Sequence, residues 1–403
     1  MQSNYRCFEL TKFIVGRGSI EYLKQIKASR AAVIHGGRSL PESLKTRIIE
    51  ILSESGTECR FIAKILNEPF FEDIYEVLDV MEEYKPDLLI AIGGGAVMDT
   101  AKGIHLFYEH PELALEDALK PYQLPALGAT AKMVAIPTTS GTGSETTSAA
   151  VFTERKTNRK HLMLADELIP HYAILDADLT DSLPSKIVAH TGMDALTHAM
   201  EASVSVAASA MVTTMAISSA LDIFENLEAS ADESSSGDLK KTAREACHVA
   251  ASLAGVSITN SCAGLAHGFD QPGPWFGLPH GLVCGLLLPY TTAFTGVHPS
   301  YVKLAKRLGY KSSSDKELCQ MLVDHIIAFN ETVGIPRSFS EAGIDEGEYL
   351  MKINDFAALA VEAIATKLSP RVPTLDEARD LYKQVFYGEN PIVSGPLIME
   401  ILL

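Results

Sequence analysis

The sequence lacks the features that mark nucleic-acid-binding, secreted and membrane-spanning proteins. Basic residues are few, 34 against 51 acidic ones for a net charge of −17, and without a basic run this argues against a nucleic-acid partner. The six cysteines include no C-x-x-C pair and are too sparse for a disulfide scaffold, so we expect reduced thiols. No run of about 18 apolar residues occurs, and residues 1–8 lack the apolar segment of a secretion signal. We therefore expect a cytoplasmic protein that does not span a membrane.

The length and composition are those of a folded globular protein. A chain of 403 residues fits two domains at about 100 to 200 residues each. Hydrophobic residues make up 47% and charged residues 21%, which is close to ordinary globular usage and argues against disorder.

The first half of the chain alternates strand-like and helical patterns, whereas the second half is helical. Segments 31–35, 59–65 and 87–92 are predicted strands, and segments 40–54 and 71–84 are predicted helices between them. Two further candidate strands cover residues 133–136 and 172–175. This alternation predicts a parallel sheet with helices on both faces. Helical spacing dominates after residue 184, so we predict an α/β domain over residues 1–183 and an all-α domain over residues 184–403.

Two loops rich in glycine or threonine follow predicted strands of the first half. The first, residues 93–102, opens a helix, where free backbone N–H groups can meet a pyrophosphate. It is not the G-x-G-x-x-G fingerprint, and a tight turn without a ligand is its alternative interpretation. The second, residues 137–147, presents many hydroxyl groups and would otherwise be a polar surface loop. Together, at the carboxyl ends of strands, they favour nucleotide binding.

Four residues of the second half suggest a metal site. Asp194 and His198 are four positions apart in a helical segment, which places them on one helix face. His267 and His280 follow, thirteen positions apart across a turn rich in proline and glycine. Three imidazoles and a carboxylate suit Fe²⁺ or Zn²⁺, with an open position for water or a substrate oxygen. For each histidine taken singly, a structural role is the simpler interpretation.

Several long motifs in order make the chain resemble the iron-containing (group III) alcohol dehydrogenases over nearly its whole length. These motifs are residues 93–102, 137–147, 176–179, 191–201 and 264–289. The resemblance implies an N-terminal dinucleotide-binding domain, a helical C-terminal domain, and a cleft between them that holds metal and substrate. It also implies a homodimer or larger homo-oligomer.

The resemblance assigns roles to individual residues. It implies one divalent metal, Fe²⁺ in preference to Zn²⁺, with the ligands Asp194, His198, His267 and His280. Its cofactor contacts fall on Gly94, Gly95, Ala96, Asp99, Thr138, Thr139, Thr147, Lys160 and Leu179, where Ala96 replaces the usual serine. The implied chemistry is hydride transfer between a nicotinamide and a small primary alcohol or aldehyde, with the metal stabilising charge on the substrate oxygen.

The chain departs from the family pattern near the late histidine pair. Gln271 stands where many members have a second histidine, and glutamine cannot serve as a general acid or base. The metal ligands are not affected, but no catalytic residue beyond the metal centre is predicted. Trp275 and Phe276 precede His280, and we expect them to narrow the substrate pocket, with plain packing as the alternative.

The segment after the first predicted strand bears on the choice of nicotinamide. Members that prefer NAD often have an acidic residue here, which accepts the ribose 2′-hydroxyl. This chain has Gly36, Gly37, Arg38 and Ser39 instead, which looks like the version in NADPH-using butanol dehydrogenase-like aldehyde reductases. Arg38 would pair with the 2′-phosphate, unless it points to solvent. NADP(H) is therefore favoured over NAD(H), and the expected activity is aldehyde reduction with NADPH.

Two other functions remain as alternatives. One is a lyase that uses NAD and a metal and resembles dehydroquinate synthase, which shares the two-domain architecture. The loop at residues 137–147 and the segment at residues 194–198 favour the dehydrogenase instead. The other is a binding protein without activity, which would have little reason to keep all four ligand positions.

Overall fold

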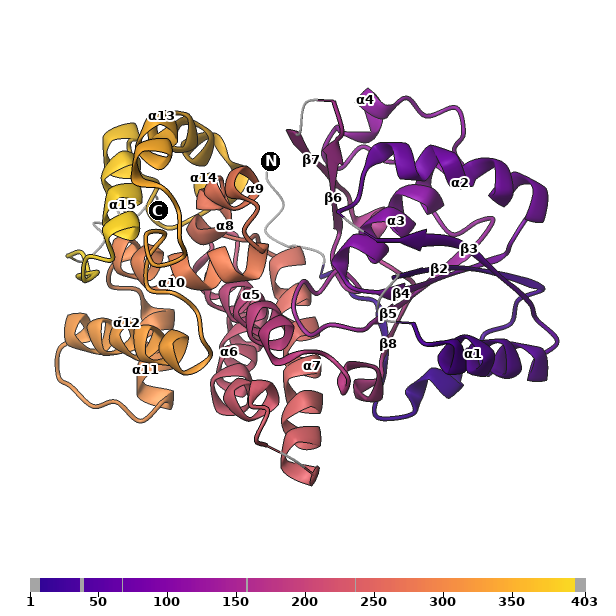
Figure 1. Cartoon of the computed structure of the whole chain (residues 1–403), viewed down its shortest axis with the longest axis horizontal. Helices are drawn as coiled ribbons and strands as arrows, with labels where there is room; N and C mark the ends of the chain where they lie inside the picture. The colour runs from indigo at the N-terminus through magenta and orange to yellow at the C-terminus, as the bar shows by residue number, and fades with distance from the viewer. Residues whose placement is uncertain (1–7, 37–39, 67, 157–158, 236, 396–403) are drawn as a thin grey trace. The chain divides into compact units, whose positions relative to one another are not determined.

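The chain forms two compact units, residues 1–182 and residues 183–403. A computed structural model describes residues 8–36, 40–66, 68–156, 159–235 and 237–395. Figure 1 shows the elements of each unit, strands and helices in the first and helices in the second. The division predicted from the sequence, between residues 183 and 184, lies one residue further along the chain.

A six-stranded parallel sheet forms the centre of the first unit. Its strand order is β1-β8-β5-β4-β2-β3, which confirms the predicted α/β fold. The strands are β1 (Lys12–Val15), β2 (Arg30–Gly36), β3 (Glu58–Ile65), β4 (Leu88–Gly93), β5 (Lys132–Pro137) and β8 (Tyr172–Leu175). Strand β4 reads LLIAIG and is buried throughout, as expected for a strand covered on both faces. An antiparallel hairpin of β6 (Ala149–Glu154) and β7 (Arg159–Leu164) stands apart from this sheet.

Helices cover both faces of the sheet (Figure 1). Helix α1 (Glu42–Glu54) and the 3-10 helix η1 (Ser19–Gln25) pack on one apolar cluster. Helices α2 (Phe71–Tyr84) and α3 (Gly95–Glu109) pack on a second cluster across the sheet. The shorter elements of this unit are α4 (Leu115–Ala118), η2 (Asp166–Leu168) and η3 (Ala177–Thr180).

The second unit is built from helices, which confirms the predicted all-α half. In the described part of residues 183–395, every regular element is an α-helix. These are α5 (Ser185–Val204), α6 (Ala210–Ala231), α7 (Gly237–Thr259), α8 (Leu265–Phe269), α9 (Pro272–Phe276), α10 (His280–Thr295), α11 (Pro299–Arg307), α12 (Asp315–Thr332), α13 (Glu346–Glu362), α14 (Ile364–Lys367) and α15 (Leu375–Tyr387). Helix α5 is buried over most of its length and packs against α6, α7 and α10.

Among the residues that the structure describes, no helix combines the length and the apolarity needed to cross a membrane.

Candidate metal centre and cofactor loops

Helix α5 presents three acidic or imidazole side chains on one buried face. Asp194, His198 and Glu201 follow one another at spacings of four and three residues, so their side chains share a face of the helix. Their exposed fractions are 3%, 6% and 4%. Buried groups of this kind need partners or a metal, because an unpaired charge in an apolar interior is costly.

Glycines allow the start of α10, which carries His280, to approach α5. Gly277 ends α9 with φ of 67°, a left-handed conformation that glycine adopts without strain, and His280 then begins α10. A Cβ atom on Gly281 would lie 2.1 Å from the carbonyl oxygen of His190 on α5. The start of α10 therefore approaches α5 at a distance that only glycine permits. His267 comes from the short helix α8.

The three predicted histidine ligands converge on the carboxylate of the fourth, Asp194. Its Oδ1 atom lies 3.6 Å from Nε2 of His267, 3.5 Å from Nε2 of His280 and 3.9 Å from Nε2 of His198. Around a tetrahedral zinc ion, nitrogen and oxygen ligands would be about 3.4 Å apart, from metal–ligand distances of about 2.0 to 2.2 Å. The rings of His198 and His267 stack with centroids 4.4 Å apart. The structure thus brings together all four residues that the sequence singled out.

Two carboxylates that the sequence reasoning missed orient the histidines. Oε2 of Glu201 accepts a hydrogen bond from Nδ1 of His267, and Oδ2 of Asp270 accepts one from Nδ1 of His280, each at 2.5 Å. Occupying Nδ1 in this way directs the lone pair of Nε2 toward the centre, which is the usual arrangement around metal-bound histidines. Glu201 lies on the same helix face as His198, and this spacing is the signal that would have identified it.

The centre also contains polar atoms that other protein groups leave unsatisfied. Within the described residues, Oδ1 of Asp194, Nδ1 of His198 and Nε2 of His267 are buried without a hydrogen-bond partner. Burial alone would raise the pKa of Asp194, but the neighbouring imidazoles of His198 and His280 hold it below its ordinary value. Burial lowers the pKa of His198 to about 4, so this ring is neutral near pH 7. An ionised carboxylate and neutral imidazoles are the forms that bind a divalent cation, and Asp194 and His198 already have these forms. For His267 and His280, burial would lower the pKa, but the neighbouring thiol and carboxylates raise it well above its ordinary value, so a metal would bind there in exchange for protons.

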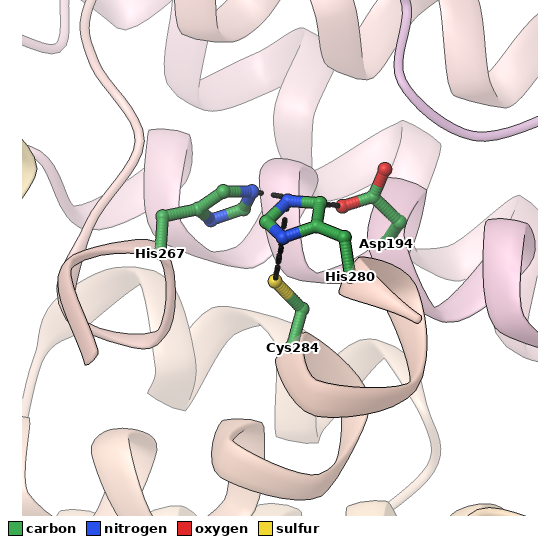
Figure 2. A group of neighbouring side chains, drawn as sticks. All are labelled: Asp194, His267, His280 and Cys284. Atoms are coloured by element: carbon green, nitrogen blue, oxygen red, sulfur yellow. Dashed lines mark hydrogen bonds and ion pairs between the residues drawn. The ribbon is translucent and has the colours of Figure 1, made fainter. Parts of the chain in front are cut away.

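A fifth side chain, not predicted from the sequence, belongs to the same group. Ligand atoms of Asp194, His267, His280 and Cys284 all lie within 4.8 Å of one another (Figure 2). The Cys284 side chain is buried and lies one helical turn after His280 on α10. This i, i+4 spacing was visible in the sequence, but it is too common to identify a ligand by itself.

In the first unit, the two predicted cofactor loops lie side by side. Gly93 at the end of β4 pairs with Pro137 at the end of β5, and the backbone N–H of Thr138 donates to the Gly93 carbonyl at 2.9 Å. Helix α3 begins at Gly95, and no side chain of the described residues caps its N-terminus at Gly94. Free N–H groups at such a helix start attract phosphate. A Cβ atom on Gly95 would lie 2.8 Å from Cγ2 of Thr142, so the two loops also need glycine to pack closely.

Two of the residues predicted to contact the cofactor, Asp99 and Thr147, have hydrogen-bond partners within the first unit. Asp99 accepts hydrogen bonds from Oγ of Ser144 at 2.6 Å and from the backbone N–H of Val151 at 3.0 Å. Oγ1 of Thr147 accepts one from Nζ of Lys102 at 3.0 Å. These bonds fasten the second loop to α3, so both residues hold the loops in place whether or not they also contact a cofactor.

The other predicted contacts are spread over the first unit. Gly36 ends β2, whereas Gly37, Arg38 and Ser39 lie outside the described residues. Thr138 is buried, and Thr139 and Ala96 are partly buried. Lys160 is exposed on β7, and Leu179 packs against the apolar cluster that also contains α1 residues. Their roles as cofactor contacts stay predictions.

Lys102 carries an expected pH dependence of stability. Burial lowers the pKa of this lysine to about 8, against an opposing effect of Asp99 and Glu145, while the ordinary value is 10.5. Between these values the unfolded chain binds the proton and the folded chain does not, so this group makes stability rise with pH. Over this pH range, we expect the free energy of unfolding of the native protein to rise by up to about 3 kcal/mol relative to that of Lys102→Met, at about 1.4 kcal/mol per pKa unit.

Denaturant titrations at several pH values would measure this difference. Lys316→Met, which removes an exposed lysine of α12, should keep the native profile. Parallel profiles for native protein and Lys102→Met would contradict the expectation.

The aromatic pair before His280 occupies two different environments. Phe276 packs against Tyr349 and Phe356 at the edge of the apolar core. Trp275 is 52% exposed and has Nζ of Lys352 4.3 Å from its ring centroid. Packing thus explains Phe276, and a substrate-pocket role for the pair stays a prediction. Nε2 of Gln271 donates to the Gly268 carbonyl at 3.0 Å, a structural contact.

Both units match one family of known proteins. Residues 11–177 match the family described as iron-containing alcohol dehydrogenase, and residues 188–386 match the C-terminal domain of the Fe-containing alcohol dehydrogenase family. The chain is 34% identical over 377 residues to the NADPH-dependent butanol dehydrogenase of Clostridium saccharobutylicum, covering 93% of this chain and 96% of that protein. It is 31% identical over 389 residues to an alcohol dehydrogenase of Thermococcus barophilus, covering 94% and 98%.

A solved structure agrees with these matches. The iron-containing alcohol dehydrogenase from Thermococcus thioreducens superposes with a TM-score of 0.86 at 30% identity, covering 95% of this chain and all of that one. The fold and the matches define a metal-dependent oxidoreductase that acts on alcohols and aldehydes. The chain belongs to the iron-containing alcohol dehydrogenase family, which confirms the resemblance noted in the sequence.

Proposed function

We propose that this protein reduces a small aldehyde to its primary alcohol with NADPH at a divalent metal held by Asp194, His198, His267 and His280. The observation that carries the proposal is the convergence of three histidine Nε2 atoms within 3.5 to 3.9 Å of one buried aspartate oxygen. That oxygen has no hydrogen-bond partner among the described residues. We propose that these four ligands bind Fe²⁺, in line with the family.

The protein groups around this centre have separable tasks. When bound, a divalent metal supplies Lewis-acid stabilisation of the negative charge that develops on the substrate oxygen during hydride transfer. Glu201 and Asp270 hold the His267 and His280 rings in the orientation that presents Nε2. Gln271 cannot exchange a proton, so the alcohol proton would come from water, the cofactor ribose or another group.

The loops of the first unit support nucleotide binding in this proposal. The uncapped start of α3 lies beside the end of β5, where open parallel sheets bind phosphates. The preference for NADPH rests on Arg38, which would pair with the 2′-phosphate, and on the likeness to a relative named as NADPH-dependent. A homodimer or larger assembly and a cytoplasmic location also stay predictions.

Steady-state kinetics with a panel of simple aldehydes would test the function. We expect net consumption of NADPH and a higher kcat/KM with NADPH than with NADH. Arg38→Ala should raise the KM for NADPH by about 10-fold or more, because a hydrogen bond to a charged group contributes about 1.5 to 3 kcal/mol. The KM for NADH, which has no 2′-phosphate, should stay nearly constant.

The same assay separates the alternatives. A lyase that recycles its nicotinamide would show no net consumption of NADPH. A native preference for NADH would overturn the cofactor assignment while leaving aldehyde reduction in place. Arg47→Ala, which removes an arginine of α1 that pairs with Glu21 and Glu50, is the matched control and should keep both KM values.

A further inference from the structure

A shift in strand register brings a lysine to the end of β2. The pairing of β2 with β3 shifts by one residue after Val33, which pairs with Phe61. Strand β3 thus has one extra residue, a β-bulge, which reverses the alternation of its side chains beyond that point. Lys64, three positions after Phe61, therefore lies on the same face of the sheet as Phe61, the face that α1 covers. It pairs with His35, the residue before the end of β2.

A second lysine reaches the same place from α1. Nζ of Lys45 lies 6.0 Å from the centroid of the Phe61 ring, and the ring of His35 lies 5.6 Å from that of Phe61. Burial lowers the pKa of His35, and the positive charges of the two lysines lower it further, although a backbone hydrogen bond and Glu42 act against them. Both ammonium groups therefore act on one buried ring at the end of β2.

The end of β2 adjoins the loop that is predicted to hold the pyrophosphate. His35 pairs with Ile92 of β4, the residue directly before the loop at residues 93–102. Neighbouring strands lie about 4.8 Å apart, and β2 is one strand away from β4 while β3 is two strands away. In such sheets the nucleotide lies across the carboxyl ends of adjacent strands, where an acidic or basic side chain distinguishes a ribose 2′-hydroxyl from a 2′-phosphate.

The two lysines differ in how far their charge is already used. Nζ of Lys45 donates to Oε1 of Glu42 at 2.6 Å, and the side chains are 26% and 85% exposed. Lys64 is exposed, and none of the described residues forms a hydrogen bond or an ion pair with it. Because the chain as a whole carries a net charge of −17 and would repel a phosphate, a local pair of ammonium groups matters for binding an anion here.

We infer that Lys45 and Lys64 bind the 2′-phosphate of NADPH and, with Glu42 as an opposing charge, set how strongly the protein prefers NADPH over NADH. The inference rests on the proposed function and adds two residues to which the family resemblance assigns no role. A lysine carries a compact charge on a flexible stem and can reach a phosphate from α1 or from β3. Glu42 would repel the phosphate and compete with it for Lys45.

Calorimetric titration of the full chain with NADP⁺ and with NAD⁺ would test the inference without relying on turnover. Lys45→Met and Lys64→Met should each raise the Kd for NADP⁺ by about 3- to 10-fold, between the effects of exposed ion pairs and of hydrogen bonds to charged groups. Glu42→Gln should lower it by about 2- to 3-fold, as expected for removal of an exposed like charge. The Kd for NAD⁺ should stay nearly constant in all three variants. A purely structural role for these residues would not produce changes of opposite sign confined to NADP⁺.

A similar ion pair on the other face of the sheet supplies matched controls. Nζ of Lys120 donates to Asp117 of α4 at 2.6 Å, and α4 packs on the cluster that contains residues of α2 and α3. Lys120→Met and Asp117→Asn should leave both Kd values unchanged.

The outcomes separate this inference from the proposed function. If both lysine variants bind NADP⁺ as the native protein does, or if they weaken NADP⁺ and NAD⁺ equally, the inference is wrong. If Arg38→Ala alone removes the preference for NADP⁺ in that case, the proposed use of NADPH stands. Tighter binding of NAD⁺ than of NADP⁺ by the native protein would contradict both the inference and the proposed cofactor.

Discussion

Asp194→Asn is expected to lower kcat/KM for an aldehyde with NADPH by about 10³-fold or more, together with loss of bound metal. Lewis-acid stabilisation by a metal contributes several kcal/mol, and each 1.36 kcal/mol corresponds to a factor of ten in rate. Asp194 is the carboxylate on which the three histidines converge. Asparagine keeps the shape of the side chain but removes its charge, so the metal loses its anionic oxygen ligand.

Metal content by mass spectrometry and steady-state kinetics would be measured on the same preparation. Asp380→Asn, which neutralises an exposed aspartate of α15, controls for loss of charge alone and should retain both metal and rate. A variant at Asp194 that lost metal but kept native kcat/KM would show that catalysis does not depend on this centre.

The sequence predicted the centre of the fold well because buried parallel strands have a clear signature. The β4 segment, LLIAIG, is apolar without interruption, and such a short run between helical patterns is typical of a strand buried on both faces. Strand β1 was missed because it has only four residues and lies at the sheet edge. The hairpin of β6 and β7 was missed because its second strand, RKHLML, mixes charge with apolar residues and gives no clean alternation.

The candidate site, too, could be predicted only in part from the sequence. Asp194 and His198 share a helix face, so local spacing alone placed them together. Their connection to His267 and His280 came from the family motifs, because no local rule relates residues so far apart. Glu201 bonds to His267 across 66 positions of sequence, and only the folded chain shows that contact. Cys284 on α10 lies near Asp194 on α5 because the two helices approach closely at Gly281. The sequence analysis did not consider this approach.

Glu201 is expected to support both the metal centre and the fold, which makes it the most informative positioning residue. Its buried carboxylate accepts the backbone N–H groups of Gly264 at 2.7 Å and Ala266 at 2.5 Å, besides Nδ1 of His267. In Glu201→Gln, the amide NH₂ would face one of these three donors. We expect metal affinity to fall by about 10- to 100-fold, as for other carboxylates behind metal-bound histidines.

The same substitution is expected to lower the free energy of unfolding by about 3 to 5 kcal/mol, because it breaks a buried charged network. Denaturant titration measures this loss, and metal competition well below the unfolding midpoint measures affinity in protein that is still folded. Glu228→Gln, at an exposed position of α6, should change neither quantity. Lower stability with native metal affinity would show that Glu201 only holds the turn at residues 264–266. Loss of metal affinity in protein that is still folded would show that Glu201 acts through His267, because its carboxylate holds that ring in the orientation that presents Nε2 to the metal.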